Sequence, residues 1–575
     1  MKLVGRLVIV VFGILLFWLL AVRTDAGRRL AQDDRKDAPA PVEGIPVTSS
    51  LVADRCGSCH SRDERGCLSR ISYERRTPEG WEEAIKRMVR LNDVNLTPDD
   101  ARKIVKYLSK NHGLAPDESR AAFYEAERRL VDEKAPTDAV RVACMQCHGL
   151  GRILSQRRTR EEWVLLGNLH VAQFPAVTGQ GFYRFTLPPG LPHPAESEGH
   201  PLDSAIDYFA KTYPLLSTEW QTWSRNIRDP RLEGRWLVVG YQLGRGRILG
   251  EMTVRPGQSD DEFTTSTTLR AVNDGSTWMR SGRAIVYAGH SWRGRSTAGG
   301  DNGPDSIREV MLVSRDWNRL EGRWFWGGYD EMAIDVSLLR IGSEPLVSLV
   351  EPYALRAGVA SQKITIYGAN LPGGLQAGDI DLGPGIRVER VGDYRPDAIT
   401  LEISVAEGAP NGVHDVSLRH HIASGAVAVF DKIDYIRVLP EAGLARLGGI
   451  KYPKQVQQFE AVAYNRGADG APGTEDDLRL GSVGAKWSIE EFPASYYDDD
   501  KDFVGTLDGQ GLFTPAFEGP NPKRANDGSN YGEVWVVASY RPEPARPDGP
   551  TLKARAYLLV TVPVYVRWDT PELSK

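Results

Sequence analysis

The 575-residue sequence has little cysteine and no excess of either charge. It contains five cysteines, and its 71 lysine and arginine residues against 76 aspartate and glutamate residues give a formal net charge of -5. This balance excludes any argument from charge for a nucleic-acid partner or for binding to anionic lipid. The chain beyond residue 200 also lacks the G-x-S-x-G, H-E-x-x-H, P-loop and dinucleotide-binding motifs. We therefore predict no catalytic residue in this chain.

Long apolar runs are scarce, and the one at the N-terminus is short. Lys2 and Arg6 precede an apolar run over residues 7–22, which is shorter than the roughly 20 residues that a membrane-spanning helix needs. A positive segment followed by a short apolar segment is typical of a secretory signal. We predict a signal peptide over 1–26, a charged linker over 27–46, and export to the periplasm. An uncleaved anchor is the alternative, and only then would the chain be held at a membrane.

Four of the five cysteines lie in two C-x-x-C-H motifs, at residues 56–60 and 144–148. Two thiols at this spacing can each add to one vinyl group of a haem, and the histidine that follows then lies under the iron as its proximal ligand. We therefore predict two covalently bound c-type haems. The expected attachment residues are Cys56, Cys59, Cys144 and Cys147, and the expected proximal ligands are His60 and His148.

Zinc and disulfide bonds are the alternatives for these cysteines. A zinc site could combine two cysteines and a histidine with one more ligand, but a histidine directly after the second cysteine is not the usual zinc spacing. A C-x-x-C redox pair would not need the histidine at all. Cys67 has no cysteine left to pair with, and we interpret it as a buried or free thiol.

An internal repeat follows each haem motif. The sequence RRTPEGW at residues 75–81 corresponds to RRTREEW at residues 157–163, which indicates two duplicated haem modules. The threonine of each copy is a natural helix N-cap, so we expect a helix to begin directly after it. In the second copy Thr159 and Glu162 have the spacing of a capping box.

The repeat also nominates a sixth ligand for each iron. Met88 follows Trp81 by seven residues, and His170 follows Trp163 by seven residues, so the two occupy equivalent places on their helices. Thioether sulfur and imidazole nitrogen are the usual sixth ligands of electron-transfer haems. The alternatives are a core methionine at Met88 and a structural histidine at His170, with His112 as a rival ligand.

The two modules differ at their ends. Residues 96–108 predict a capped helix that resembles the C-terminal helix of a small cytochrome c. The second copy has no clean equivalent, because residues 174–200 are rich in aromatic residues, glycine and proline. We predict an all-α dihaem cytochrome c domain over residues 47–199.

From about Leu232 the pattern changes to alternating strands and glycine-rich turns. The sequence RLEGRW occurs at 231–236 and again at 319–324, which indicates equivalent strands of one barrel over residues 200–344. Five tryptophans in this range are expected in the barrel core or at its rim rather than around a cofactor. They are Trp236, Trp278, Trp292, Trp324 and Trp326.

Two further all-β domains are expected after the barrel. Short alternating strands over 345–438 fit an immunoglobulin-like sandwich, and a last β sandwich runs from 439 to 575. The last domain carries acidic loops at 469–477 and 498–502. Oxygen-rich loops can bind calcium, although solvated turns explain them equally well. The fold class is thus multidomain, one all-α haem domain followed by three all-β domains.

These features together resemble a known family. The haem motifs, the RRTPEGW and RRTREEW segments, the paired LEGRW strands and the GTLDGQGLFTPA segment at 505–516 resemble the α subunit of quinohemoprotein amine dehydrogenase. The resemblance covers nearly the whole chain after the signal, in the same domain order.

The resemblance implies a heterotrimeric periplasmic enzyme that oxidatively deaminates primary amines. It implies a small partner subunit with a cysteine tryptophylquinone, a β-propeller subunit, and a soluble copper protein or cytochrome c as electron acceptor. This chain would be the dihaem electron-transfer subunit, with His60, Met88, His148 and His170 as axial ligands. By itself it would not be catalytic.

Two other functions remain alternatives. A dihaem peroxidase would need an iron position that opens, whereas the repeat supplies a sixth ligand in each module. An exported adhesive or carbohydrate-binding protein with an attached cytochrome would use the β domains instead.

Overall fold

A computed structural model describes residues 43–120, 134–145, 148–174, 177, 200–298, 305–493, 498–524, 528–543 and 549–563. The predicted signal peptide, most of the predicted linker, and Cys147 lie outside these residues. The chain divides into two compact units, residues 1–74 and 75–575, which are described separately below. Within the described residues no helix is long and apolar enough to cross a membrane.

The first unit holds the first C-x-x-C-H motif. Helix α2 (Ser50–Cys56) begins at Ser49, whose side chain accepts a hydrogen bond from the Val52 backbone N–H, as an N-cap residue should. The helix leads directly into the motif, and a short 3-10 helix, η1 (Ile71–Tyr73), closes the unit. Buried apolar residues hold α2 and the following loop together. They are Val47, Val52, Cys67, Leu68 and Ile71.

The second unit begins with helices and two three-residue strands. Threonine N-caps open α3, α4, α6 and α8, and a proline occupies the first turn of α3, α4 and α9. The helices are α3 (Pro78–Asn92), α4 (Pro98–Asn111), α5 (Pro116–Arg120), α6 (Asp138–Cys144), α7 (Gly151–Leu154), α8 (Arg160–Gln173), α9 (Pro201–Thr212) and α10 (Thr218–Ser224), and the strands are β1 (Glu74–Arg76) and β2 (Gln156–Arg158).

Helix α9 supplies the closing helix that the sequence pattern did not reveal for the second module. Its residues Ala205, Ile206 and Phe209 pack in one core with Val140 of α6 and Trp163 of α8. Contact with α8 is close at Gly167, where a Cβ atom would lie 2.9 Å from the Ile206 side chain. Residues 201–212 and 218–224, which lie in the range predicted for the barrel domain, therefore form helices, and α9 completes the second module.

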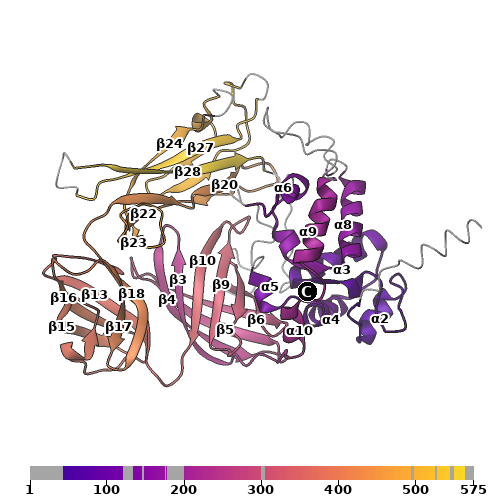
Figure 1. Ribbon diagram of the computed structural model, residues 1–575, viewed down its shortest axis with the longest axis horizontal. Coiled ribbons are helices and arrows are strands. Elements are labelled where there is room, and N and C mark those ends of the chain that lie inside the picture. The colour runs from indigo at the N-terminus through magenta and orange to yellow at the C-terminus, as the bar shows by residue number, and fades with distance from the viewer. Residues whose placement is uncertain are drawn as a thin grey trace, which may run out of the picture. The chain divides into compact units, whose positions relative to one another are not determined.

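The barrel is closed by eight antiparallel strands in the order β10-β3-β4-β5-β6-β7-β8-β9 (Figure 1). Strand β10 lies between the two strands that begin with the repeated LEGRW sequence, β3 and β9. The strands are β3 (Gly234–Gln242), β4 (Gly246–Pro256), β5 (Glu262–Ala271), β6 (Thr277–Tyr287), β7 (Ser291–Thr297), β8 (Ile307–Val313), β9 (Arg319–Trp326) and β10 (Met332–Arg340).

Side chains fill the barrel interior, as expected for an eight-stranded barrel. Trp236, Trp292 and Trp324 are fully buried there, and Trp278 and Trp326 pack against the same cluster. This confirms the prediction that these tryptophans lie in the barrel core or against it.

Buried charge joins helix α3 to the outside of the barrel. Glu79, in the first turn of α3, forms ion pairs with Arg293 of β7 and Arg308 of β8. Burial opposes ionisation of Glu79, but the two guanidinium groups outweigh this effect and lower its pKa. Lys106 of α4 makes a second connection, to Asp261 and Glu262. Helices α3 and α4 are therefore fixed against the barrel wall.

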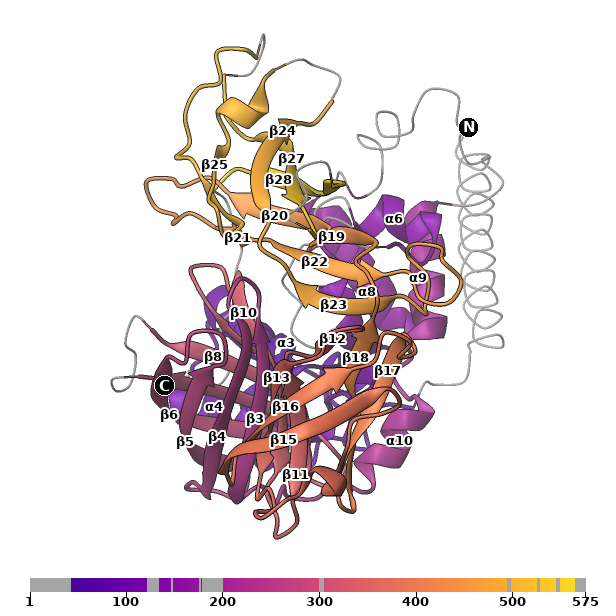
Figure 2. The same cartoon turned by 90° about the vertical axis from the view of Figure 1, so that its left-hand side faces the viewer.

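Two β domains follow the barrel (Figure 2). In the first, two four-stranded sheets, β11-β13-β16-β15 and β12-β18-β17-β14, enclose one core. Its strands are β11 (Leu346–Glu351), β12 (Ala354–Arg356), β13 (Gln362–Ala369), β14 (Ile380–Asp381), β15 (Ile386–Arg395), β16 (Ala398–Val405), β17 (Gly412–Leu418) and β18 (His421–Phe430).

The last domain has three sheets, β19-β22-β23, β20-β28-β27-β24 and β21-β26-β25. Its strands are β19 (Tyr435–Leu439), β20 (Ala442–Arg446), β21 (Gln457–Gln458), β22 (Glu460–Asn465), β23 (Leu478–Ser482), β24 (Lys486–Glu491), β25 (Gly505–Leu507), β26 (Leu512–Pro515), β27 (Gly532–Tyr540) and β28 (Leu552–Thr561). Ile436 and Val438 of β19 pack in this domain's core, so the domain begins a few residues before the boundary at 439 that we expected.

The acidic loops of this domain are held by internal hydrogen bonds. Asp476 and Asp477 accept bonds from backbone N–H groups of their own loop. In the other loop, Asp498 and Asp500 form ion pairs with Arg524, and their oxygens lie within 4.8 Å of a Glu491 oxygen. These contacts are those of structural turns, and calcium binding there stays an untested alternative.

Candidate haem site

The structure assigns a role to most positions of the R-R-T-x-E-x-W repeat. Thr77 and Thr159 are the N-caps of α3 and α8, accepting from the backbone N–H groups of Gly80 and Glu162 respectively. The second arginine of each copy lies over the tryptophan of its own copy, at 5.6 Å from Arg76 to the Trp81 ring and 5.8 Å from Arg158 to the Trp163 ring. The repeat thus builds the same helix start twice.

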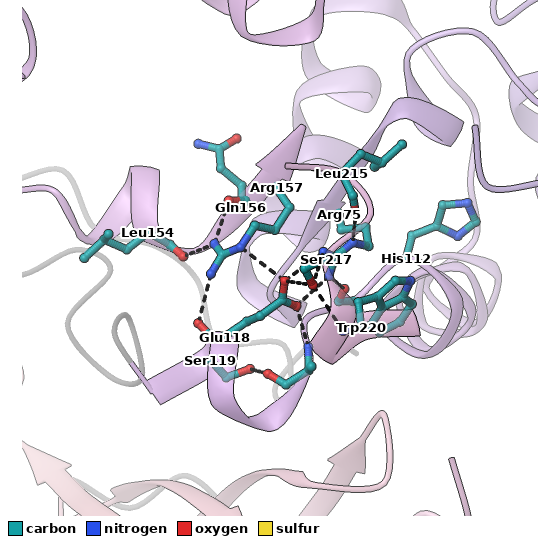
Figure 3. A network of polar contacts seen from close by, with 12 residues as sticks. Arg75, His112, Glu118, Ser119, Leu154, Gln156, Arg157, Leu215, Ser217 and Trp220 are labelled. Atoms are coloured by element: carbon teal, nitrogen blue, oxygen red, sulfur yellow. Dashed lines mark hydrogen bonds and ion pairs between the residues drawn. The ribbon is translucent and has the colours of Figure 1, made fainter. Parts of the chain in front are cut away.

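The first arginine of each copy reaches one shared carboxylate, Glu118 of α5 (Figure 3). Arg75 donates to both Glu118 oxygens, at 2.6 and 2.8 Å, and the Arg157 Nε lies 3.3 Å from Glu118 Oε1. Ser217 also donates to Glu118, at 2.7 Å. Burial favours the neutral acid, but Arg75 and Arg157 outweigh it and lower the pKa of Glu118 to about 2. Glu118 therefore joins the two haem modules as a buried anion.

Replacement of Glu118 by glutamine should strongly destabilise the helical part. Glu118→Gln leaves the guanidinium groups of Arg75 and Arg157 buried without a counter-charge, which costs about 3–5 kcal/mol of unfolding free energy. Because the folded pKa of about 2 lies below the ordinary 4.5, the carboxylate stabilises the fold above pH 4.5, and this contribution is lost as the pH falls towards 2. Urea unfolding of the unmodified protein and of Glu118→Gln at several pH values, followed by far-ultraviolet circular dichroism, measures this difference in unfolding free energy.

Asp207→Asn is the matched control. Asp207 of α9 forms an ion pair with Arg160 of α8, but both side chains are more than half exposed. Exposed ion pairs contribute little to the free energy of unfolding. Equal unfolding midpoints for Glu118→Gln and Asp207→Asn would show that the buried network is not what holds the modules together.

A cavity of about 400 Å³ lies between the second C-x-x-C-H motif and helix α8. We call it the His148–His170 cavity, because both histidines line it together with Cys144, residues of α3, α8 and α9, and the segment around α7. Its volume falls within the range of small-molecule and cofactor sites. Of the predicted second-haem residues, the structure brings Cys144, His148 and His170 to one cavity, and Cys147 lies outside the described residues.

Both histidines of the cavity have one ring nitrogen engaged by a backbone carbonyl. His148 Nδ1 lies 2.8 Å from the Gly149 oxygen, and His170 Nδ1 lies 2.8 Å from the Leu166 oxygen. A carbonyl oxygen can only accept, so the ring nitrogen that faces it must carry the proton. The proton of each neutral ring is therefore on Nδ1 and the lone pair is on Nε2. This is the tautomer in which Nε2 can bind a metal. In the first unit, His60 has the same arrangement, with Nδ1 2.7 Å from the Ser69 oxygen.

Comparison with known protein families agrees with this geometry. A model of the haem-binding domain of quinohemoprotein amine dehydrogenase A, alpha subunit, matches residues 47–185. Models of domains II, III and IV of the same alpha subunit match residues 229–341, 344–431 and 436–573. The chain belongs to the quinohemoprotein amine dehydrogenase alpha-subunit family. It is thus a haem-binding subunit of an amine dehydrogenase, an oxidoreductase complex of several subunits.

Curated proteins and solved structures give no further information on function. No curated protein matches the chain. Among solved structures, a redesigned β-barrel is 13% identical, with a TM-score of 0.17, over 19% of this chain and 92% of its own. Cadherin-like domains 1 to 4 of zebrafish RET are 8% identical, with a TM-score of 0.16, over 57% of this chain and 66% of their own. Likenesses this weak carry no argument about function.

The residues of the His148–His170 cavity fit the haem that the amine dehydrogenase family implies. Leu169 and Phe174 line the cavity and are 38% and 61% exposed, so an apolar ligand there would cover apolar side chains that now face solvent. The cysteine and histidine donors around the C-x-x-C-H motif and the apolar wall therefore fit a haem.

The remaining predicted ligands are placed as follows. Cys56, Cys59 and His60 lie in the first unit, and Met88 lies on α3 in the second unit, so its ligation of the first haem stays a prediction. The Met88 sulfur accepts a hydrogen bond from the Asn92 side chain at 3.6 Å. His112, the rival of His170, is buried at the end of α4 with its ring against Trp81. It does not line the described His148–His170 cavity, whereas His170 does.

Proposed function

We propose that this chain is the dihaem c-type cytochrome subunit of a periplasmic amine dehydrogenase. In this proposal it accepts electrons from a tryptophylquinone in a small partner subunit and passes them to a soluble copper protein or cytochrome c. A β-propeller subunit completes the heterotrimer. Family membership supports the amine dehydrogenase complex, and the two C-x-x-C-H motifs support two covalent haems.

The observation that carries the proposal is the pair of imidazoles on one cavity. His148 and His170 both line it, and in both rings Nδ1 lies at hydrogen-bond distance from a carbonyl oxygen, which places the lone pair of the neutral ring on Nε2. When bound, a haem iron supplies a one-electron redox couple. The protein's part is to fix two nitrogen donors and to surround them with apolar side chains, which suits electron transfer without ligand exchange.

This arrangement argues against the peroxidase alternative. A peroxidase needs an iron position that is free to bind peroxide, and a histidine from α8 in the cavity of the proximal histidine would occupy it. Within the described residues the barrel interior is filled by its own side chains and leaves no room there for a cofactor. We infer that the β domains act as a platform for the partner subunits.

Two haems of unequal potential are expected. A thioether ligand raises the potential relative to a second imidazole, so the haem ligated by Met88 should have the higher potential and the haem of the His148–His170 cavity the lower. A redox titration of the haem-loaded protein, after its intact mass has confirmed two haems, should resolve two one-electron transitions. Met88→Ala should move only the higher transition and abolish the far-red charge-transfer band of a ferric haem with methionine ligation.

The matched control is Met252→Ala. Met252 is buried in the barrel core and is not a predicted ligand, so its loss should leave both transitions in place. A single transition in the unmodified protein, or persistence of the charge-transfer band in Met88→Ala, would contradict the ligand assignment. A mass for one haem would contradict the dihaem proposal itself.

A further inference from the structure

One residue that lines the His148–His170 cavity carries a buried donor that has no acceptor among the described residues. Trp163 of α8 lines the cavity and is 2% exposed. Its indole N–H finds no hydrogen-bond acceptor among the described residues. A buried N–H without a partner costs about 1–3 kcal/mol, so native structures rarely keep one unless a ligand or water accepts the bond.

The other copy of the repeat shows what is missing at Trp163. Trp81, its equivalent, is equally buried, and its indole N–H donates to the His112 backbone oxygen at 2.8 Å. The corresponding carbonyl in the second module is that of Tyr213, which accepts from the Arg158 N–H just as His112 accepts from the Arg76 N–H. Trp163 makes no bond to it. The two copies thus share the backbone hydrogen bond to this carbonyl, but only Trp81 donates its indole N–H to it.

Four arginines and one glutamate, Glu83, line the same cavity, so its charge is mainly positive, and the arginines come from both modules. Arg158 and Arg152 belong to the second module, whereas Arg76 and Arg87 flank or lie on α3 of the first. Positions 76, 80, 83 and 87 follow a helical spacing of three and four, and all four line the cavity. Helix α3 thus presents this face to the second module's cavity, while Met88 lies on a different face.

We propose that Trp163, Arg76 and Arg87 bind the carboxylates of the haem in the His148–His170 cavity. A haem carries two propionate groups, which are anionic and need hydrogen-bond donors and positive charge when they enter a protein. Trp163 supplies a neutral N–H donor, and Arg76 and Arg87 supply charge. This inference rests on the proposed function, because it requires a haem in this cavity.

The consequence is that one module tunes the redox potential of the other module's haem. A propionate charge stabilises ferric iron electrostatically, and donors or cations near that charge offset it, which raises the potential. Helix α3, which carries the predicted ligand of one haem, would thereby also help to set the potential of the other. This would keep the gap between the two potentials small enough for electrons to pass without a large uphill or downhill step.

The test compares Trp163→Phe with Trp81→Phe in the haem-loaded protein. Trp163→Phe should lower the potential of the lower-potential haem only, and it should shift the propionate bending band in the resonance Raman spectrum. Trp81→Phe removes an N–H that already has a backbone acceptor, so both readouts for that haem should stay unchanged. If Trp163 only donates to a water molecule, Trp163→Phe will alter stability but neither readout, and the proposal is wrong.

Arg87→Gln provides a second test that does not disturb the core, because Arg87 is exposed. It should lower the same potential by an amount that changes the ratio of oxidised to reduced haem up to tenfold, or about 59 mV for one electron. Arg90→Gln is its control, since Arg90 lies on the same helix but does not line the described cavity. Equal shifts for the two arginine variants would overturn the proposal. The intact mass is measured first, so the absence of the second haem would be recognised as failure of the proposed function instead.

Discussion

Removal of residues 2–26 should yield a chain without covalent haem. Covalent attachment takes place on the outer, oxidising side of the membrane, and the N-terminal sequence from Lys2 to Ala26 is the only segment that predicts export. A chain retained in the cytoplasm keeps its thiols free. Intact mass spectrometry and haem staining after denaturing electrophoresis measure the result, and the expected loss is complete.

The control for this deletion is a chain in which an unrelated secretory signal replaces residues 1–26. That chain should again carry two haems, because only the route of export matters. The haem-free protein should also be less stable, since the apolar wall at Leu169 and Phe174 would stay exposed and ligand binding stabilises the folded state. Covalent haem in the cytoplasmic chain would show that the N-terminal segment is not a signal.

The purified haem-loaded chain should not be reduced by a primary amine. Amine oxidation removes two electrons and a proton from carbon, which requires an electrophilic carbonyl cofactor and a base. The two histidines of the His148–His170 cavity are both proposed as iron ligands, so neither is left to act as a base there. Haem absorbance under anaerobic conditions should therefore remain that of the ferric state for hours, and dithionite, which reduces haem directly, is the positive control.

Much of this architecture could be predicted because it depends on local sequence patterns. The C-x-x-C-H spacing, the threonine caps and the two RLEGRW strands depend on residues close together in the chain. The prediction that Trp236, Trp292 and Trp324 form a barrel core was confirmed. Large apolar residues on strands with alternating polarity are usually buried on the inner face. The repeat predicted that His170 belongs with His148, and both line one cavity, while their ligation of an iron stays a prediction.

The contacts between distant segments were not predictable in this way. Glu118 joins Arg75 and Arg157 across 43 and 39 residues of sequence, and nothing in the pattern around Glu118 distinguishes it from an exposed glutamate. The paired arginines were the available signal, since an arginine repeated at equivalent positions suggests a shared anion. Glu79 is similar, because its partners Arg293 and Arg308 lie on barrel strands more than 200 residues away.

Helix α9 was missed for a different reason. The predicted module ended near residue 200 because residues 174–200 have no helical periodicity, so the next amphipathic helix was assigned to the barrel. The structure shows that Ile206 and Phe209 complete the core around Trp163. When a long insertion separates two helices of one module, the sequence pattern alone does not indicate that the two helices pack together.

Reconstitution of amine-driven haem reduction tests most directly whether this chain is the electron-transfer subunit of an amine dehydrogenase. The haem-loaded chain is mixed with a primary amine in a stopped-flow spectrometer, first alone and then with the quinone-bearing subunit and the propeller subunit. We expect no reduction in the first experiment and, in the second, rapid reduction that takes up one electron at each of two haems. Reduction at a catalytic rate by the chain alone, or a complete three-subunit complex that turns over amine while the haems stay ferric, would contradict it.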